Sequence, residues 1–207
     1  MKIFRIIAIA LGLLISNIQV KAQSASPMSF NVEAGWTLSK PTDTDKAKSG
    51  FNIGITAEYL LSRSWFVDAG LKLQSKPWEI NHSSIIEGQR GISVKATPYY
   101  LNIPIHVGYR FTLTDNVALT GAVGPYIGIG LWGSGKESAA TISEKVDNVF
   151  DDWMKRFEIG ADICIGAEFM KRYLVSAGYS IQFNNFDNGG LLSNRNQTFS
   201  LSVGYKF

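Results

Sequence analysis

The chain has 207 residues, a formal net charge of +3 and a hydrophobic content of 45%. Its length suits one domain with a sizeable interior. Its one cysteine, Cys164, excludes an internal disulfide, so hydrogen bonding and packing alone must hold the fold together.

Residues 1–22 are predicted to be a secretory signal peptide, which leaves 23–207 as the mature domain. Lys2 and Arg5 precede an apolar run over 6–15, and small residues precede the expected cleavage site. The apolar run is too short to span a bilayer. Removing the three basic residues of this segment from the 20 of the whole chain leaves 17, equal to the 17 acidic residues. We therefore expect no nucleic-acid partner.

Eight segments of the mature chain alternate apolar and polar residues with the period of two that is typical of β-strands. They are 28–37, 51–61, 65–75, 97–111, 117–131, 156–168, 173–183 and 198–207. The segments 97–111 and 117–131 form a predicted hairpin. Each arm exceeds the five or six residues usual for a soluble strand and is long enough to cross a bilayer at a tilt. No run of about eighteen apolar residues predicts a membrane helix in the mature chain.

The connections between these segments alternate strictly between short and long. The short ones are 62–64, 112–116 and 169–172, and the long ones are 38–50, 76–96, 132–155 and 184–197. This alternation is typical of outer-membrane barrels, which have short periplasmic turns and longer extracellular loops. We therefore predict an all-β fold, an eight-stranded antiparallel up-and-down transmembrane barrel.

Aromatic residues gather near both ends of the predicted strands. Tyr59, Trp65, Tyr109, Phe111, Phe169, Tyr173, Tyr205 and Phe207 lie near the short turns, and Trp36, Phe51, Tyr99, Trp132, Phe157 and Phe183 lie near the long connections. Two belts are expected of aromatic rings at two membrane interfaces. They indicate that the apolar face of the strands points outward.

Alternation then assigns ten ionisable side chains to the inward face: Glu33, Glu58, Asp68, Lys72, His106, Arg110, Glu158, Asp162, Glu168 and Lys206. The interior of an eight-stranded barrel is only wide enough for its own side chains. Because an unpaired buried charge is very costly, we expect Lys72, Arg110 and Lys206 to bridge several carboxylates. The interior is expected to be a closed network rather than a conducting pore.

Pro104 and Pro125 lie within the two arms of the central hairpin, where proline removes a ladder hydrogen bond. Centring the hairpin on Thr114 places Pro104 opposite Gly124. The two prolines are therefore expected to share one bulge or kink.

The segments Tyr-Leu-Asn-Ile-Pro-Ile at 100–105, Gly-Tyr-Arg-Phe at 108–111 and Gly-Ala-Val-Gly-Pro-Tyr-Ile-Gly at 121–128 resemble the outer-membrane β-barrel families common in Bacteroidetes, the PorT-like or "outer membrane protein beta-barrel" domains. The resemblance implies a barrel of OmpX or OmpA size in the Gram-negative outer membrane, in contact with lipid and lipopolysaccharide. The ending on Phe207 resembles the C-terminal assembly signal of outer-membrane proteins, which implies recognition by the barrel-assembly machinery.

Few residues support catalysis. Some eight-stranded outer-membrane barrels are lipid A deacylases, in which a lipid-facing histidine activates a serine. Here His106 has inward parity, and His82 is merely followed by Ser83 and Ser84 in a long connection. We predict no catalytic residue and no cofactor, with a lipid A-modifying enzyme as an alternative.

Metal binding is also not predicted. The acidic residues of the first and third long connections offer oxygen ligands for Ca²⁺ but lack EF-hand spacing: Asp43, Asp45, Asp147, Asp151 and Asp152. Within 136–156, apolar residues recur at three-to-four spacing, which predicts a short amphipathic helix: Ile142, Val146, Val149, Phe150 and Trp153. We expect it to cap the barrel mouth, and contact with a partner or the lipid headgroups is the alternative.

The expected role is structural or interactive: envelope integrity, adhesion, or support of a secretion or envelope complex. A surface or envelope partner would bind through the four long connections at 38–50, 76–96, 132–155 and 184–197. One rival is a lipocalin-like barrel that binds a small apolar ligand, which would require the apolar face to point inward. Another is a narrow channel.

Overall fold

A computed structural model describes residues 27–42, 46–82, 92–139, 142–185 and 195–207. Ten strands and one short helix occur among these residues: β1 Met28–Pro41, β2 Lys48–Leu60, β3 Trp65–Ser75, β4 Trp78–His82, β5 Ile92–Thr114, β6 Val117–Ala139, β7 Ile142–Val146, α2 Val149–Asp152, β8 Phe157–Phe169, β9 Tyr173–Gln182 and β10 Asn196–Lys206. No helix in the described ranges is long and apolar enough to cross a membrane. The predicted signal peptide lies outside these ranges.

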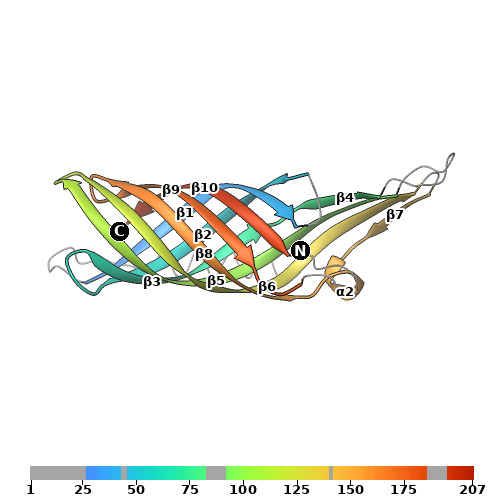
Figure 1. Ribbon diagram of the computed structural model, residues 1–207, viewed down its shortest axis with the longest axis horizontal. Helices are drawn as coiled ribbons and strands as arrows, with labels where there is room; N and C mark the ends of the chain where they lie inside the picture. The colour runs from blue at the N-terminus through green and yellow to red at the C-terminus, as the bar shows by residue number, and fades with distance from the viewer. Residues whose placement is uncertain (1–26, 43–45, 83–91, 140–141, 186–194) are drawn as a thin grey trace.

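Eight of the strands pair into a closed ring, which forms the barrel in Figure 1. The ring runs β1–β2–β3–β5–β6–β8–β9–β10, and it closes because β10 pairs with β1 from Asn31 opposite Lys206 to Pro41 opposite Asn196. Every ladder of the ring is antiparallel. Each of the eight predicted strand segments forms one strand of this ring. The predicted fold class, an eight-stranded up-and-down barrel, is confirmed.

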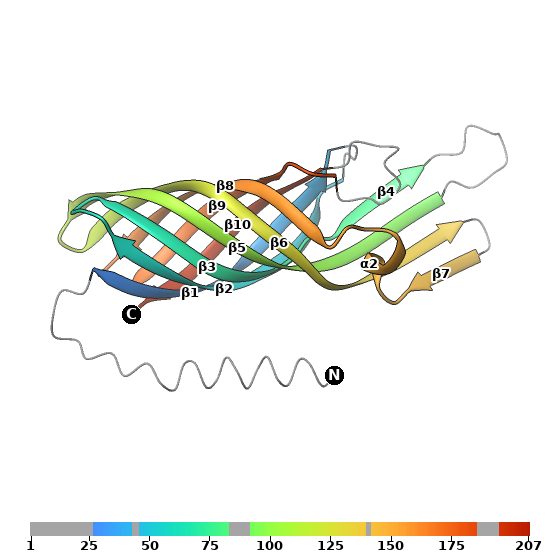
Figure 2. The same ribbon diagram turned by 90° about the horizontal axis from the view of Figure 1, so that it is seen from below.

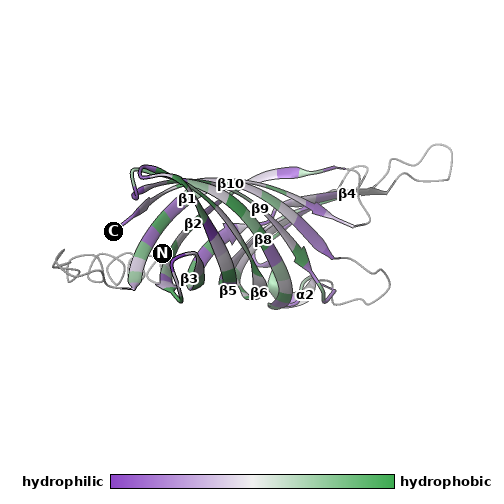
Figure 3. Cartoon of the chain, turned by 60° about the vertical axis from the view of Figure 1, so that its left-hand side comes forward, coloured by the Kyte–Doolittle hydropathy of each residue, from purple (hydrophilic) through white to green (hydrophobic). Residues whose placement is uncertain are grey.

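The barrel is apolar outside and polar inside. Large apolar side chains such as Ile105, Ile163 and Val203 are exposed on the outer face, whereas Asn102 and Glu168 are buried. Hydrophilic and hydrophobic residues alternate along the barrel strands in Figure 3. This is the reverse of the polarity that a lipocalin-like barrel with an apolar ligand would need.

Aromatic rings cluster at both ends of the barrel. At the end with long connections, the rings of Tyr99 and Trp132 stack with centroids 5.2 Å apart. At the end with short turns, Trp65 packs edge-on against Tyr109 at 5.2 Å. Both described ends of the chain also lie at the short-turn end, where the backbone N–H of Phe207 donates to the carbonyl of Phe30.

The strands β5 and β6 are 23 residues long and continue beyond the ring. There β4 pairs with β5 and β7 pairs with β6, which makes an antiparallel sheet β4–β5–β6–β7 (Figures 1 and 2). We call the part of this sheet formed by residues 78–82, 92–97, 134–139 and 142–146 the projecting sheet. The sequence analysis treated 76–96 and 132–155 as loops, and this was wrong. The alternation of Val94 and Ala96 with Lys95 and Thr97 is a strand pattern that continues the predicted arm.

The helix expected within 136–156 is also largely absent. Residues 136–139 belong to β6 and residues 142–146 to β7, and only Val149–Asp152 is helical. The side chain of Asn148 caps this helix by accepting a hydrogen bond from the backbone N–H of Phe150. Residues 142–146 form a strand because pairing with β6 satisfies the hydrogen-bonding groups of their backbone. Two of the five apolar residues predicted for this helix, Val149 and Phe150, still lie at the barrel mouth, and Trp153 packs against them. The buried cluster there consists of Trp78, Ala96, Tyr100, Val149, Phe150 and Met154. We call this cluster the cap.

One interruption of the β5–β6 ladder involves both hairpin prolines, because Pro104 borders it and Pro125 lies within it. Pro104 lies opposite Tyr126, two positions away from the expected Gly124, and pairing resumes at Val107 opposite Val123. The predicted register was wrong because Thr114 already pairs with Val117, so the turn is centred later in the chain than the sequence analysis assumed.

Candidate functional site

The ten ionisable residues predicted for the lumen belong to three groups stacked along the barrel. The group nearest the short turns contains Arg110, Lys206, Glu58 and Glu168. The Arg110 guanidinium lies 2.7 Å and 2.8 Å from the two carboxylate oxygens of Glu58 and 3.3 Å from Glu168. The Lys206 ammonium lies 3.0 Å from Glu58 and 2.9 Å from Glu168. Two cations and two carboxylates therefore neutralise one another and connect β2, β5, β8 and β10.

The middle group centres on His106. Its Nδ1 lies 2.9 Å from Asp68, and its Nε2 lies 3.5 Å from Asp162. Nearby, the Lys72 ammonium lies 2.6 Å from Glu33. Because both ring nitrogens of His106 face carboxylates inside the barrel, the ring is not placed to activate a serine on the lipid-facing side.

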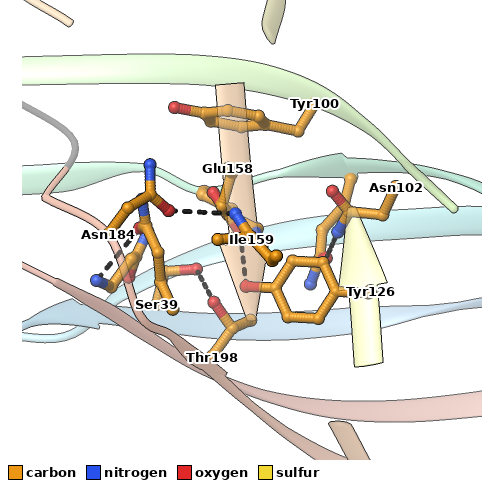
Figure 4. Close-up of polar contacts among 12 residues, drawn as sticks. Ser39, Tyr100, Asn102, Tyr126, Glu158, Ile159, Asn184 and Thr198 are labelled. Atoms are coloured by element: carbon orange, nitrogen blue, oxygen red, sulfur yellow. Dashed lines mark hydrogen bonds and ion pairs between the residues drawn. The ribbon is translucent and has the colours of Figure 1, made fainter. Parts of the chain in front are cut away.

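The third group lies just below the cap and includes a residue that the sequence analysis missed. Lys76 forms an ion pair with Glu158, and each side chain is only 1% exposed. The Tyr126 hydroxyl donates to the same carboxylate, and the Lys76 ammonium lies 5.2 Å and 5.0 Å from the ring centroids of Tyr100 and Tyr126. Figure 4 shows Tyr126 and Glu158 joined beneath Tyr100. Lys76 was missed because it follows the predicted end of a strand, although it continues the inward parity of Lys72.

These groups leave little free space in the lumen. A cavity of about 120 Å³ surrounds His106 and Lys72, and a hollow of about 310 Å³ opens at the short-turn end below Arg110 and Lys206. Toward the long connections, the Lys76–Glu158 pair and the cap fill the barrel. Phe150 of the cap packs where a side chain at Gly130 would otherwise lie.

The other candidates from the sequence do not assemble into a site in the described parts of the chain. Asp151 is 3.0 Å from Arg156 and accepts from the side chain of Asn148. No metal-binding group of three or more acidic, histidine or cysteine side chains occurs within the described ranges. Asp43, Asp45, Ser83 and Ser84 lie outside those ranges, and His82 ends β4.

A closed antiparallel barrel with an apolar exterior, two aromatic belts and paired charges inside defines a transmembrane barrel of the bacterial outer membrane. More particularly, the chain belongs to the family described as outer membrane protein beta-barrel domain, whose model matches residues 8–207. This match confirms the predicted outer-membrane localisation, whereas export by the signal peptide stays a prediction.

Several solved structures are similar to the chain. Ail, the attachment invasion locus protein of Yersinia pestis, is 19% identical, and the match covers 88% of this chain and 99% of Ail with a TM-score of 0.46. The outer membrane protein OprG from Pseudomonas aeruginosa is 14% identical, with 88% and 96% covered and a TM-score of 0.47. Neisserial surface protein A is 12% identical, with 89% and 100% covered and a TM-score of 0.43. No curated protein matches the chain.

The filled lumen predicts that the protein does not conduct ions. Purified protein added to planar lipid bilayers is expected to leave the current at the level seen after adding detergent alone, because the lumenal ion pairs and the cap occupy the barrel. Reproducible unitary steps from folded protein would contradict the closed interior.

Proposed function

We propose that the protein is a non-enzymatic structural and surface-interaction component of the outer membrane, whose sealed barrel holds the projecting sheet outside the cell. The observation that carries this proposal is the continuation of β5 and β6 as paired strands beyond the ring. Outer-membrane barrels have their long connections on the extracellular side, which supports an extracellular position for the sheet. Because paired strands hold their side chains in more precise positions than loops do, the sheet offers a rigid surface for a partner.

The cap supports this proposal because it ties the sheet to the barrel. Trp78 and Ala96 come from the base of the sheet, while Val149, Phe150 and Met154 come from α2 and the residue after its C-cap. These side chains pack on Tyr100 of the barrel, so the sheet and the barrel form one body. Adhesion, envelope integrity or support of an envelope complex would all use such a surface.

Two finer assignments belong to the same proposal. The motifs at 100–105 and 121–128 support a place in the PorT-like, Bacteroidetes branch of the family. The C-terminal Phe207, exposed at the end of β10, supports recognition by the barrel-assembly machinery, and the exposed apolar exterior supports contact with outer-membrane lipid and lipopolysaccharide.

Shortening the sheet tests the proposal. Trp78 pairs with Ala96, and Gly135 pairs with Val146, so each pair can be joined directly by an Asn-Gly turn in place of 79–95 and 136–145. The shortened protein keeps the cap and is expected to reach the outer membrane and to change its gel mobility on boiling. In a strain lacking the gene, it is expected to fail to restore surface adhesion and detergent resistance.

The full-length gene serves as the control in the same strain. Full restoration of both phenotypes by the shortened protein would overturn the proposed role of the sheet. A loss of the boiling-dependent mobility shift would instead show that the new Asn-Gly turns damage the barrel. Variants with only one of the two hairpins shortened would then separate damage to the barrel from loss of the sheet.

A further inference from the structure

One row of charged residues crosses all four strands of the projecting sheet. Glu79 of β4 lies opposite Lys95 of β5, Lys95 lies opposite Lys136 of β6, and Lys136 lies opposite Lys145 of β7. Directly opposed residues of antiparallel strands share a face of the sheet. Three lysines therefore stand side by side on one face, which we call the lysine face.

The lysine face is the outward face of the sheet. The cap residues Trp78 and Ala96 alternate with Glu79 and Lys95, so the cap lies against the opposite face. Along β5, Lys95 shares the outward parity of Tyr99, whose ring stacks on Trp132 at the edge of the barrel. The lysine face thus continues the lipid-facing side of the barrel beyond its aromatic belt.

The β5–β6 pairs on either side of the lysine row are uncharged and able to form hydrogen bonds. Thr97 lies opposite Ser134 on the barrel side of the lysine row, and Ser93 lies opposite Ser138 on the far side. Lysines flanked by hydroxyl groups supply charge and hydrogen bonds together, which suits phosphate oxygens.

The charges of this face are not balanced within the described residues. Glu79 is nearly buried and receives ion pairs from Lys48 and from Lys95, whose side chain is 57% exposed. Lys136 and Lys145 are exposed, and no ion pair to either occurs among the described residues. Asp147 is the one acidic residue lining the hollow of about 340 Å³ beside the lysine row, as far as the structure describes it.

Like charges at directly opposed positions of a sheet repel each other. Here Lys136 faces a lysine on each side, Lys95 and Lys145. An anion that binds between the ammonium groups would remove this repulsion, and the hollow beside them offers it room. The arrangement therefore favours an anionic ligand.

The height of the lysine row identifies the source of the anion. Lys136 is four residues beyond Trp132 on β6, which is about 13 Å along a strand. At the usual tilt of barrel strands this is a rise of about 10 Å above the aromatic belt. Belt rings lie at headgroup level, and lysine side chains can extend back toward that level.

We propose that Lys95, Lys136 and Lys145 bind the phosphate groups of outer-leaflet lipid headgroups. This inference rests on the proposed function only in placing the projecting sheet outside the membrane. It assigns the lysine face to the surrounding lipid and leaves the rest of the sheet for a partner. Bound headgroups would hold the sheet at a fixed height above the bilayer.

The test uses the folded full-length protein in detergent with short-chain lipids as probes. Native mass spectrometry is expected to show tighter binding of dihexanoyl phosphatidic acid than of dihexanoyl phosphatidylcholine. A lysine near an anionic membrane surface contributes about a fivefold gain in affinity. The double variant Lys136→Gln/Lys145→Gln is therefore expected to bind phosphatidic acid about 25-fold more weakly.

Two variants serve as matched controls. Lys155→Gln removes an exposed lysine at the same end of the barrel but outside the lysine face, and it is expected to bind as the wild type does. Lys136→Arg/Lys145→Arg keeps the charge and is expected to retain most of the binding. The boiling-dependent mobility shift checks that every variant is folded.

Equal binding of phosphatidic acid by the wild type and the Gln variant would overturn the proposal. Lysine-dependent binding of inorganic pyrophosphate as tight as that of phosphatidic acid would overturn the assignment to lipid and indicate a soluble phosphorylated ligand. Neither result changes the outcome of the sheet-shortening assay, because that assay measures adhesion and detergent resistance. The proposed function is therefore tested separately.

Discussion

Replacing Lys76 with methionine is expected to lower the free energy of unfolding by about 3–5 kcal/mol, the usual cost of breaking a buried ion pair. Lys76 and Glu158 are both 1% exposed, and methionine fills a similar volume without a charge. The Glu158 carboxylate would then keep only the hydroxyl of Tyr126, because its second oxygen has no hydrogen bond among the described residues. Urea unfolding in lipid vesicles measures the change.

The double variant Lys76→Met/Glu158→Gln separates the loss of a pair from the creation of an unpaired charge. It is expected to recover most of the lost stability, because neither remaining side chain is charged and Tyr126 can still bond to the amide. Lys155→Met, which alters an exposed lysine, is expected to stay within about 0.5 kcal/mol of the wild type. If the double variant is as unstable as Lys76→Met, packing around Tyr100 and Tyr126 rather than charge would explain the effect.

The barrel itself was predictable because its signals repeat. Each strand must present an apolar face to lipid and a polar face to the lumen, so alternation was visible in all eight segments. The turns after Leu60, Thr114 and Phe169 are short, and the strict sorting of short and long connections needs no tertiary information. Parity alone placed Arg110 and Lys206 on the same face as Glu58, although it could not say which cation reaches which carboxylate.

The projecting sheet was not predictable in the same way. Beyond the ring the strands no longer face the apolar interior of the membrane, so the outward positions of β5 change from Tyr99 to Thr97 and Lys95. A strand with polar residues outward and small residues such as Ala96 inward resembles a loop in composition. The pairing of β4 and β7 with the long arms depends on tertiary contacts at the cap, and these join residues far apart in the chain.

The charges of the barrel and of the projecting sheet differ on the two sides of the aromatic belt. Inside the membrane, the lumenal charges are paired with one another. Above the aromatic belt, Lys136 and Lys145 have no such pairs within the described residues. The paired charges stabilise the barrel, and the unpaired ones are available to a ligand. This difference is why the lumen supports a structural role and the sheet an interactive one.

Replacing Gly124 with valine is expected to prevent the barrel from closing. A Cβ atom at this position would contact the carbonyl oxygen of Ile105 at a distance that real Cβ atoms do not adopt, and it would lie 2.8 Å from the Cα of His106. These are backbone atoms, so no side-chain rotation relieves the contact. The site lies where the β5–β6 ladder is interrupted between Pro104 and Val107, and glycine is what allows the two backbones to approach there.

Gly121→Val is the matched control for this prediction. Gly121 lies on the same strand, and a Cβ atom there would have no neighbour within 4 Å. Valine is a good strand former and glycine a poor one, so the control is expected to fold at least as well as the wild type. Gly124→Val is expected to lose about 3 kcal/mol or to fail to fold. The folded fraction in vesicles, read from the mobility of unboiled samples, measures both variants. Equal folding of the two would show that β5 and β6 can separate at the prolines without cost, and that the close approach at Gly124 does not hold the barrel's central hairpin together.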